Sequence, residues 1–188
     1  MKKEPIVDNE ILSILNDYHL FIDSDKHVDM PYLVNKVDIN HPSSLIGDAS
    51  LIAAYPLGAT VLDCEMRERS EYKYSFKILT DAVTSKMLFR MDEGSKTHWN
   101  KHLHVPVNEQ QVPTPHFHKV GDDGIMFAYS TDNLKSYNTP LNINDGFAAF
   151  CEECHIDQQN LKIVVHEEGT LPLEYEQAPD SFLKIEFP

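Results

Sequence analysis

Histidines concentrate in one stretch of the chain, between His98 and His118. This stretch holds five of the ten histidines, and four of them form two His-x-His pairs, His102/His104 and His116/His118. Alternate residues of an extended chain point to the same face, so each pair presents two imidazoles side by side. Imidazoles titrate near neutral pH and bind metal ions when they are neutral. The spacing indicates a functional site, and two kinds of chemistry are open to it.

The first chemistry is metal-independent cleavage of a phosphodiester. It needs one imidazole as general base, a second as general acid, and a cation that stabilises the charge of the transition state. Arg90, Lys101 or Lys119 can supply the cation. Asp92 shares a strand face with Arg90, and an arginine–carboxylate pair there would orient a histidine. The catalytic candidates are His98, His102, His104, His116, His118, Arg90 and Asp92.

The second chemistry is metal binding, which needs three or four converging ligands. On this hypothesis the ligands of a divalent transition metal are His102, His104, His116 and His118. His102, His104 and Glu109 resemble the first motif of the cupin barrels, whereas His116 occupies the position at which that family has a glycine. The acid–base hypothesis requires no cofactor. A purely structural role for these histidines is the third alternative.

A second motif, Cys151-Glu-Glu-Cys154-His155, matches the C-x-x-C-H pattern of c-type haem attachment. Both thiols fall on the apolar face of an expected helix, beside Phe147 and Phe150. Buried free cysteine behaves as a small hydrophobic residue. We therefore expect these cysteines to pack in the core.

Alternating apolar and polar residues predict the strands that hold the histidine stretch. The segments are 59–69, 72–79, 86–92, 116–120 and 125–130. Pro106, Pro113 and Pro115 exclude a helix between the third of these segments, 86–92, and the fourth, 116–120. A short extended piece is expected around His102–His104.

Helical spacing of apolar residues predicts a helix within residues 5–24 and another from Asn142 to about His155. Further extended segments are expected at 32–37, 161–166 and 182–187, and a short apolar element at 45–58. The fold class is therefore α+β: a bent, mainly antiparallel sheet of about five to seven strands with an N-terminal and a C-terminal helix. Residues 1–58 form an N-terminal helical and irregular segment, and 59–188 form the sheet domain with the site. We expect the two parts to pack as one compact domain.

The chain carries a formal net charge of −14, distributed unevenly. Residues 59–120 hold 9 Lys/Arg and 8 Asp/Glu, whereas residues 121–188 hold 3 and 13. The middle third can therefore bind a phosphate group, and the acidic side chains of the last third can imitate the negative charge of phosphates. The sequence has neither a long apolar run nor a signal peptide, which predicts a cytoplasmic location and no membrane partner.

The order of these motifs resembles small prokaryotic toxin-type proteins of the TumE kind. The matching elements are Leu88-Phe-Arg90-Met-Asp92, His98, one of the two His-x-His pairs, Gly124, Phe127-Ala-Tyr129 and Phe147. The resemblance covers about residues 59–155 and implies an RNA-directed toxin with a curved antiparallel sheet. The segment Pro113–Val120, PTPHFHKV, is similar to an uncharacterised group from bacteria and their phages.

Three functional hypotheses follow. The first is a His-centred, RNA-directed endonuclease-like enzyme of a toxin or anti-defence system. The second is a non-catalytic acidic inhibitor of the phage anti-defence type, which mimics nucleic acid and binds a basic nucleic-acid-binding protein. The third is a protein that binds a metal ion through histidines.

Overall fold

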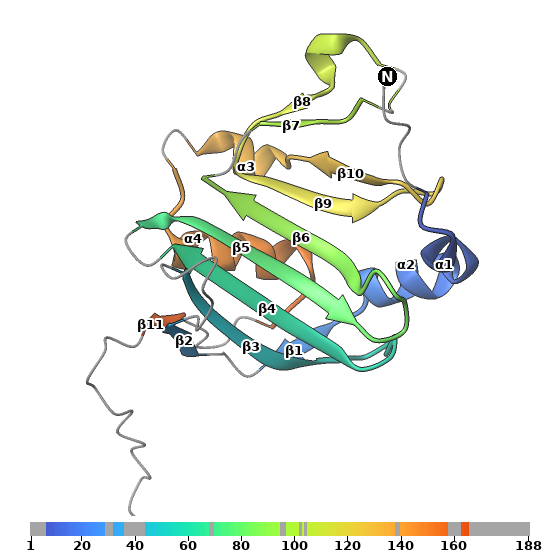
Figure 1. Ribbon diagram of the computed structural model, residues 1–188, viewed down its shortest axis with the longest axis horizontal. Helices are drawn as coiled ribbons and strands as arrows, with labels where there is room; N and C mark the ends of the chain where they lie inside the picture. Colours follow the sequence, from blue (N-terminus) through green and yellow to red (C-terminus); the bar gives the residue numbers. More distant parts are fainter. Residues whose placement is uncertain are drawn as a thin grey trace, which may run out of the picture.

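The computed structural model describes residues 7–28, 32–35, 44–67, 70–94, 97–101, 103, 105–137, 140–157 and 163–165. Its helices are α1 (Asn9–Ser13), α2 (Leu15–Asp23), α3 (Asp132–Ser136) and α4 (Ile143–Glu153), with one 3-10 turn, η1 (Val107–Glu109) (Figure 1). Its strands are β1 (Lys26–Val28), β2 (Tyr32–Asn35), β3 (Ser44–Ala53), β4 (Thr60–Arg67), β5 (Ser70–Thr80), β6 (Met87–Glu93), β7 (His98–Trp99), β8 (Gln111–Val112), β9 (His116–Val120), β10 (Met126–Tyr129) and β11 (Val164–Val165). None of the helices described is long and apolar enough to cross a membrane.

Most strands belong to one sheet, in the order β10-β9-β6-β5-β4-β3-β2-β11. The first seven of these strands pair antiparallel, β11 pairs parallel with β2, and β1 pairs with β3 outside this row. The long strands twist and curve across the molecule (Figure 1). β7 and β8 form a separate two-stranded sheet. This arrangement confirms the α+β class and the mainly antiparallel sheet.

One face of the sheet packs against helices, as Figure 1 shows for α4, which lies behind it. Phe76 of β5 contacts Phe147 and Phe150 of α4, with ring centroids 5.3 and 5.4 Å apart. Cys151 and Cys154 of the same helix are buried as free thiols, which confirms that they pack in the core. The two cysteines of the C-x-x-C-H motif are therefore part of the hydrophobic core, whereas His155 is exposed.

Helix α4 begins where the sequence predicts. The Asn142 side chain accepts hydrogen bonds from the backbone N–H groups of Asn144 and Asp145, as an N-cap residue does. Gly146 is required on the first turn, because a side chain there would collide with the Tyr74 hydroxyl. The helix thereby lies close against β5.

Other elements differ from the sequence-based expectations. The N-terminal helix is two helices, because Ile14 leaves the helical conformation and the Ser13 hydroxyl donates to the carbonyl of Glu10. The apolar element expected at 45–58 is the long strand β3. Helix α3, capped by Thr131, was not predicted, since five residues carry too little periodicity. The expected strand at 182–187 lies outside the described residues.

Tyr18 connects α2 to the two strands that carry the site. Its hydroxyl donates to the carbonyl of Leu88 at 3.1 Å and accepts from the N–H of Val120 at 3.0 Å, and the side chain is buried. Tyr18→Phe leaves both backbone groups without a partner. We expect a loss of about 1–3 kcal/mol in the free energy of unfolding, measured by urea denaturation. Tyr137→Phe, at an exposed position, should change it little, and equal midpoints for the two variants would contradict the assignment.

Candidate functional site

The pairing of β6 with β9 brings four of the predicted residues to one face of the sheet. Asp92 lies opposite His116, and Arg90 lies opposite His118. Directly opposed residues of antiparallel strands share a face, and so do residues two apart along a strand. Phe117, between the two histidines, points to the other face and contacts Phe89 in the core. The His-x-His pair therefore presents both imidazoles to the polar side, as its spacing predicts.

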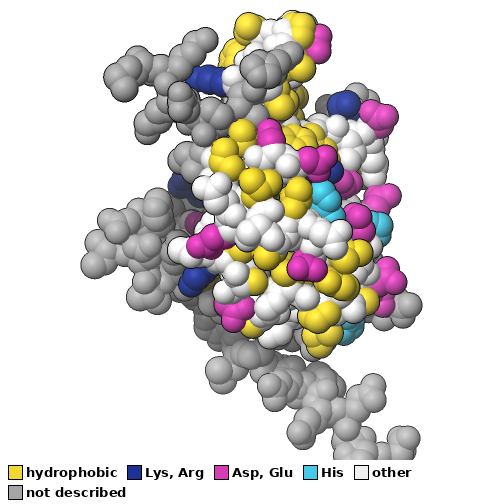
Figure 2. All heavy atoms as spheres, turned by 90° about the vertical axis from the view of Figure 1, so that its right-hand side faces the viewer, with side chains coloured by type: hydrophobic (Ala, Val, Ile, Leu, Met, Phe, Trp, Pro, Cys, Tyr) yellow, Lys and Arg dark blue, Asp and Glu magenta, His cyan; other side chains and the backbone are white. Residues whose placement is uncertain are grey.

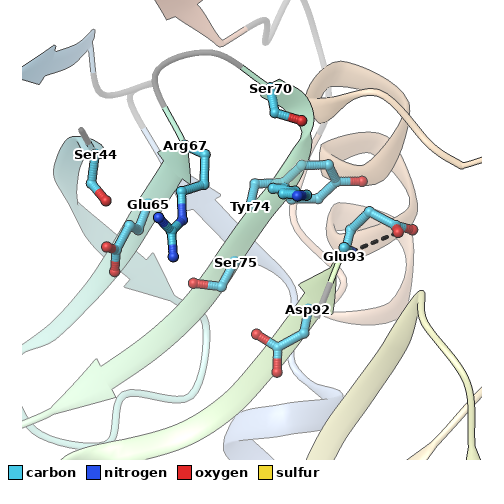
Figure 3. Close-up of a pocket in the computed structure, with 10 residues that line it drawn as sticks. Ser44, Glu65, Arg67, Ser70, Tyr74, Ser75, Asp92 and Glu93 are labelled. Carbon is cyan, nitrogen blue, oxygen red and sulfur yellow. Dashed lines mark hydrogen bonds between the residues drawn. The ribbon is translucent and has the colours of Figure 1, made fainter. Parts of the chain in front are cut away.

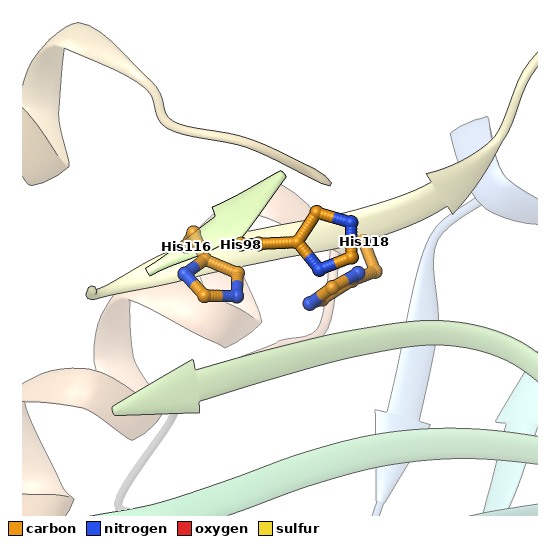
Figure 4. Close-up of side chains that lie close together, drawn as sticks. All are labelled: His98, His116 and His118. Atoms are coloured by element: carbon orange, nitrogen blue, oxygen red, sulfur yellow. The ribbon is translucent and has the colours of Figure 1, made fainter. Parts of the chain in front are cut away.

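The third histidine of the site comes from the separate two-stranded sheet. His98 lies on β7, which runs above the edge of the main sheet. Its ring centroid is 4.8 Å from that of His118 and 6.0 Å from that of His116, and the last two are 4.7 Å apart. One nitrogen from each of the three rings lies within 4.8 Å of the other two. Figure 4 shows the three rings gathered close together beside β9.

Asn100 ties β7 to the main sheet and so positions His98. Its side chain donates to the carbonyl of Ala128 at 2.6 Å and accepts from the N–H of Ala128 at 2.8 Å. Ala128 belongs to β10, the edge strand, so one buried amide replaces the two hydrogen bonds of a neighbouring strand. Asn100 was not among the residues predicted from the sequence. The sequence does place the amide of Asn100 two residues after His98, a spacing that puts both side chains on the same face of an extended chain.

Asp92 connects the histidines to Arg90. Arg90 Nε and Nη2 each lie 2.7 Å from Asp92 Oδ1, while Asp92 Oδ2 lies 3.3 Å from His118 Nε2 and 3.9 Å from His116 Nε2. Burial acts to raise the pKa of Asp92, but the contact with His118 and the charge of Arg90 outweigh it and leave the pKa below its ordinary value. Asp92 is therefore a buried, ionised carboxylate with one oxygen held by arginine and the other turned to the imidazoles.

His116 is held as a neutral ring. It is only 1% exposed, and burial together with the neighbouring His118 lowers its pKa to about 4. Its Nδ1 lies 3.2 Å from the carbonyl of Pro113, a contact that places the proton on Nδ1. The lone pair is then on Nε2, the nitrogen that faces Asp92. His118 Nε2 is also buried, and among the described residues it has no hydrogen-bond partner of good geometry.

The three histidines open onto a cavity of about 360 Å³. Arg90, Asp92, Met87 and Met126 complete its lining. A larger hollow of about 640 Å³ lies next to it on the same face of the sheet, and Asp92 belongs to both (Figure 3). The site is therefore accessible from the polar face, at one end of an extended depression.

The structure brings together five of the seven catalytic candidates: His98, His116, His118, Arg90 and Asp92. His102 and His104 lie outside the described residues, so their place in either hypothesis stays a prediction. Among the described residues, the cluster that could bind a metal ion consists of His98 and the second His-x-His pair, His116 and His118. Of the proposed cations, Arg90 lies at the site. Lys119 lies over the ring of Tyr129, 4.8 Å from its centroid, because it alternates with His118 along β9.

Comparisons with known proteins add no functional assignment. The chain matches no protein-family model, no curated protein and no solved structure. The geometry of the cluster formed by His98, His116 and His118 is therefore the basis for assigning a function.

Proposed function

We propose that the protein binds a divalent transition-metal ion through His98, His116 and His118. The observation that carries this proposal is the convergence of three imidazoles from two separate sheets, with one nitrogen of each within 4.8 Å of the others. Ligand nitrogens that bind zinc at about 2.0–2.1 Å stand roughly 3.3 Å apart in tetrahedral geometry. Small side-chain rotations would close the remaining difference.

A cation also accounts for the charges that meet at the site. His116 Nε2 carries a lone pair and faces Asp92 Oδ2 at 3.9 Å, so two hydrogen-bond acceptors confront one another. His118 Nε2 is buried without a well-aligned partner. His116 and His118 would hold a metal ion here, and its positive charge would offset the negative charge of the Asp92 carboxylate. The contact of His116 Nδ1 with a backbone carbonyl is the usual support of a metal-bound histidine.

Three protein ligands leave a coordination position open. Catalytic zinc sites use this arrangement, in which the fourth position holds a water molecule. A metal ion held by the three histidines would lower the pKa of such a water to near 7 and would so supply a hydroxide at neutral pH. Asp92, fixed by Arg90, would hold this water or act as a further ligand. We therefore propose a hydrolytic metal centre.

Metal titration tests the site directly. Calorimetry with Zn²⁺, and Co²⁺ absorption spectra, should show one ion bound per chain by the wild type. His98→Ala should bind at least about 100-fold more weakly, because it removes a ligand. His98 is only partly buried, so this variant should still fold. His27→Ala, at an exposed position outside the cluster, is the control. A wild type that binds neither ion, or a His98→Ala variant with wild-type affinity, would refute the proposal.

A second candidate function is metal-independent acid–base cleavage of RNA. The specific observation in its favour is the contact between Asp92 and His118, since a carboxylate orients an imidazole in many hydrolases. Arg90, whose side chain is 36% exposed, lies beside it as a cation for the transition state. RNA cleavage that persists in EDTA and is lost in His118→Ala would support this function. Cleavage that EDTA abolishes would support the metal centre.

The acidic-inhibitor hypothesis rests mainly on the last third of the chain. Residues 166–188 lie outside the described residues. On the face drawn in Figure 2, the acidic side chains are scattered among apolar and uncharged ones and form no continuous row. A basic nucleic-acid-binding partner and a role in toxin or anti-defence systems therefore remain predictions.

A further inference from the structure

The hollow of about 640 Å³ beside the histidine cavity has no role in metal binding. It extends over β3, β4, β5 and β6 on the polar face, from Ser44 to Asp92 (Figure 3). The register places its residues in two rows across the sheet. Ser44 lies opposite Arg67, and Arg67 opposite Ser70. Ser75 lies opposite Asp92, which is itself opposite His116. The second row therefore leads from the hollow into the histidine cluster.

The charges of the hollow favour an anionic ligand. Arg67 and Lys73 are exposed and form no ion pair with any carboxylate in the part of the chain that is described. Two of the three acids at the hollow lie near a cation of the sheet. Glu65 lies 3.9 Å from Lys77, and Asp92 is held by Arg90. The third, Glu93, accepts a hydrogen bond from the backbone N–H of Gly94 through Oε1 and points toward α4 (Figure 3), and its Oε2 is buried without a hydrogen-bond partner among the described residues.

The uncharged donors of the hollow suit a phosphate. The hydroxyl groups of Ser44, Ser70 and Ser75 have no hydrogen-bond partner among the described residues. Together with a guanidinium and an ammonium group, they offer more donors than a carboxylate can accept. Arginine and lysine are the usual partners of phosphate oxygens in proteins.

The distance from these cations to the histidines sets the size of the ligand. Arg67 lies on β4 and His116 on β9, three strand spacings away, which is roughly 14 Å. A phosphate between Arg67 and Lys73 therefore cannot contact a metal ion at the histidines. A substrate that reaches both places must extend along the row through Ser75 and Asp92.

We propose that this hollow is an anchoring subsite for a phosphate group, and that the substrate of the metal centre is an extended organic phosphate of nucleotide or oligonucleotide size. The substrate assignment rests on the proposed metal centre, whereas the phosphate subsite stands without it. In a chain with a net charge of −14, Arg67 and Lys73 offer a phosphate a local positive charge that offsets the repulsion from the rest of the molecule.

Calorimetric titration of the full chain with inorganic phosphate, adenosine monophosphate and a short single-stranded RNA tests the proposal. Each ligand is titrated into zinc-loaded and EDTA-treated protein. Arg67→Gln/Lys73→Gln should weaken binding of the nucleotide and the RNA at least about tenfold, because it removes both charge-assisted contacts. Zinc affinity should stay unchanged. Lys86→Gln/Lys135→Gln removes the same charge at exposed positions outside the hollow and is the matched control.

Each outcome decides a separate point. Nucleotide or RNA binding that depends on Arg67 and Lys73 supports the subsite, even if zinc does not bind. Equal weakening of ligand binding in the control variant would show that binding depends only on net charge, and would overturn the subsite. The absence of binding by every phosphate ligand would also overturn it. Inorganic phosphate bound as tightly as adenosine monophosphate and the RNA would overturn the extended substrate.

Discussion

Lys26→Met is expected to destabilise the protein by about 3 kcal/mol, because it leaves buried backbone acceptors without a donor. Lys26 is only 3% exposed, and its ammonium group donates to the carbonyls of Ile22 and Ser24 at 2.8 Å and of Cys154 at 2.9 Å. These carbonyls belong to the C-terminal ends of α2 and α4. At such ends the last carbonyl groups have no donor within the helix, and the helix carries a partial negative charge. One side chain thus ties together two helices that are far apart in the sequence.

Urea denaturation followed by circular dichroism measures this loss. Methionine keeps most of the volume of the lysine stem, so the change isolates the ammonium group. Lys135→Met on α3 removes an exposed lysine and should change the free energy of unfolding by less than about 0.5 kcal/mol. If both variants unfold at the wild-type midpoint, the three hydrogen bonds do not stabilise the fold.

The metal-free protein is expected to lose stability as the pH falls from about 6.5 to about 4. The pKa of His116 is about 4 in the folded protein and about 6.5 in the unfolded chain. Between these values the unfolded chain binds more protons, so each step toward lower pH favours unfolding. The difference in pKa corresponds to about 3 kcal/mol, fully present above the unfolded pKa and lost as the pH approaches the folded pKa.

Unfolding free energies measured in EDTA across this pH range test the expectation. His116→Asn keeps a donor for the carbonyl of Pro113 but has no titratable ring. Its stability should be lower than that of the wild type near neutral pH, with a flatter dependence on pH. A wild-type stability that stays constant over the range would show that His116 takes up a proton as easily in the folded state as in the unfolded one.

Local sequence determined several parts of the site. The period of two along a strand places His116 beside His118, and Arg90 beside Asp92, whatever the rest of the fold does. The same pattern predicts β4, β5, β6, β9 and β10, and with them the α+β class. The apolar face of the second helix likewise predicts the burial of Cys151 and Cys154, because helical spacing alone puts them beside Phe147 and Phe150.

Only the tertiary structure decided which of these residues meet. The pairing of β6 with β9 puts Asp92 opposite His116, although 24 positions of sequence separate them, and no local pattern specifies that register. His98 joins the cluster because the amide of Asn100 fixes β7 to the edge of the sheet. Spacing along the chain favoured the pair His102/His104 as strongly as the pair His116/His118 for a place in the site. Such spacing shows which side chains share a face, but it does not show which strand lies opposite them. Strand register and side-chain hydrogen bonds across the sheet edge are long-range contacts, and they gather the three imidazoles around one point.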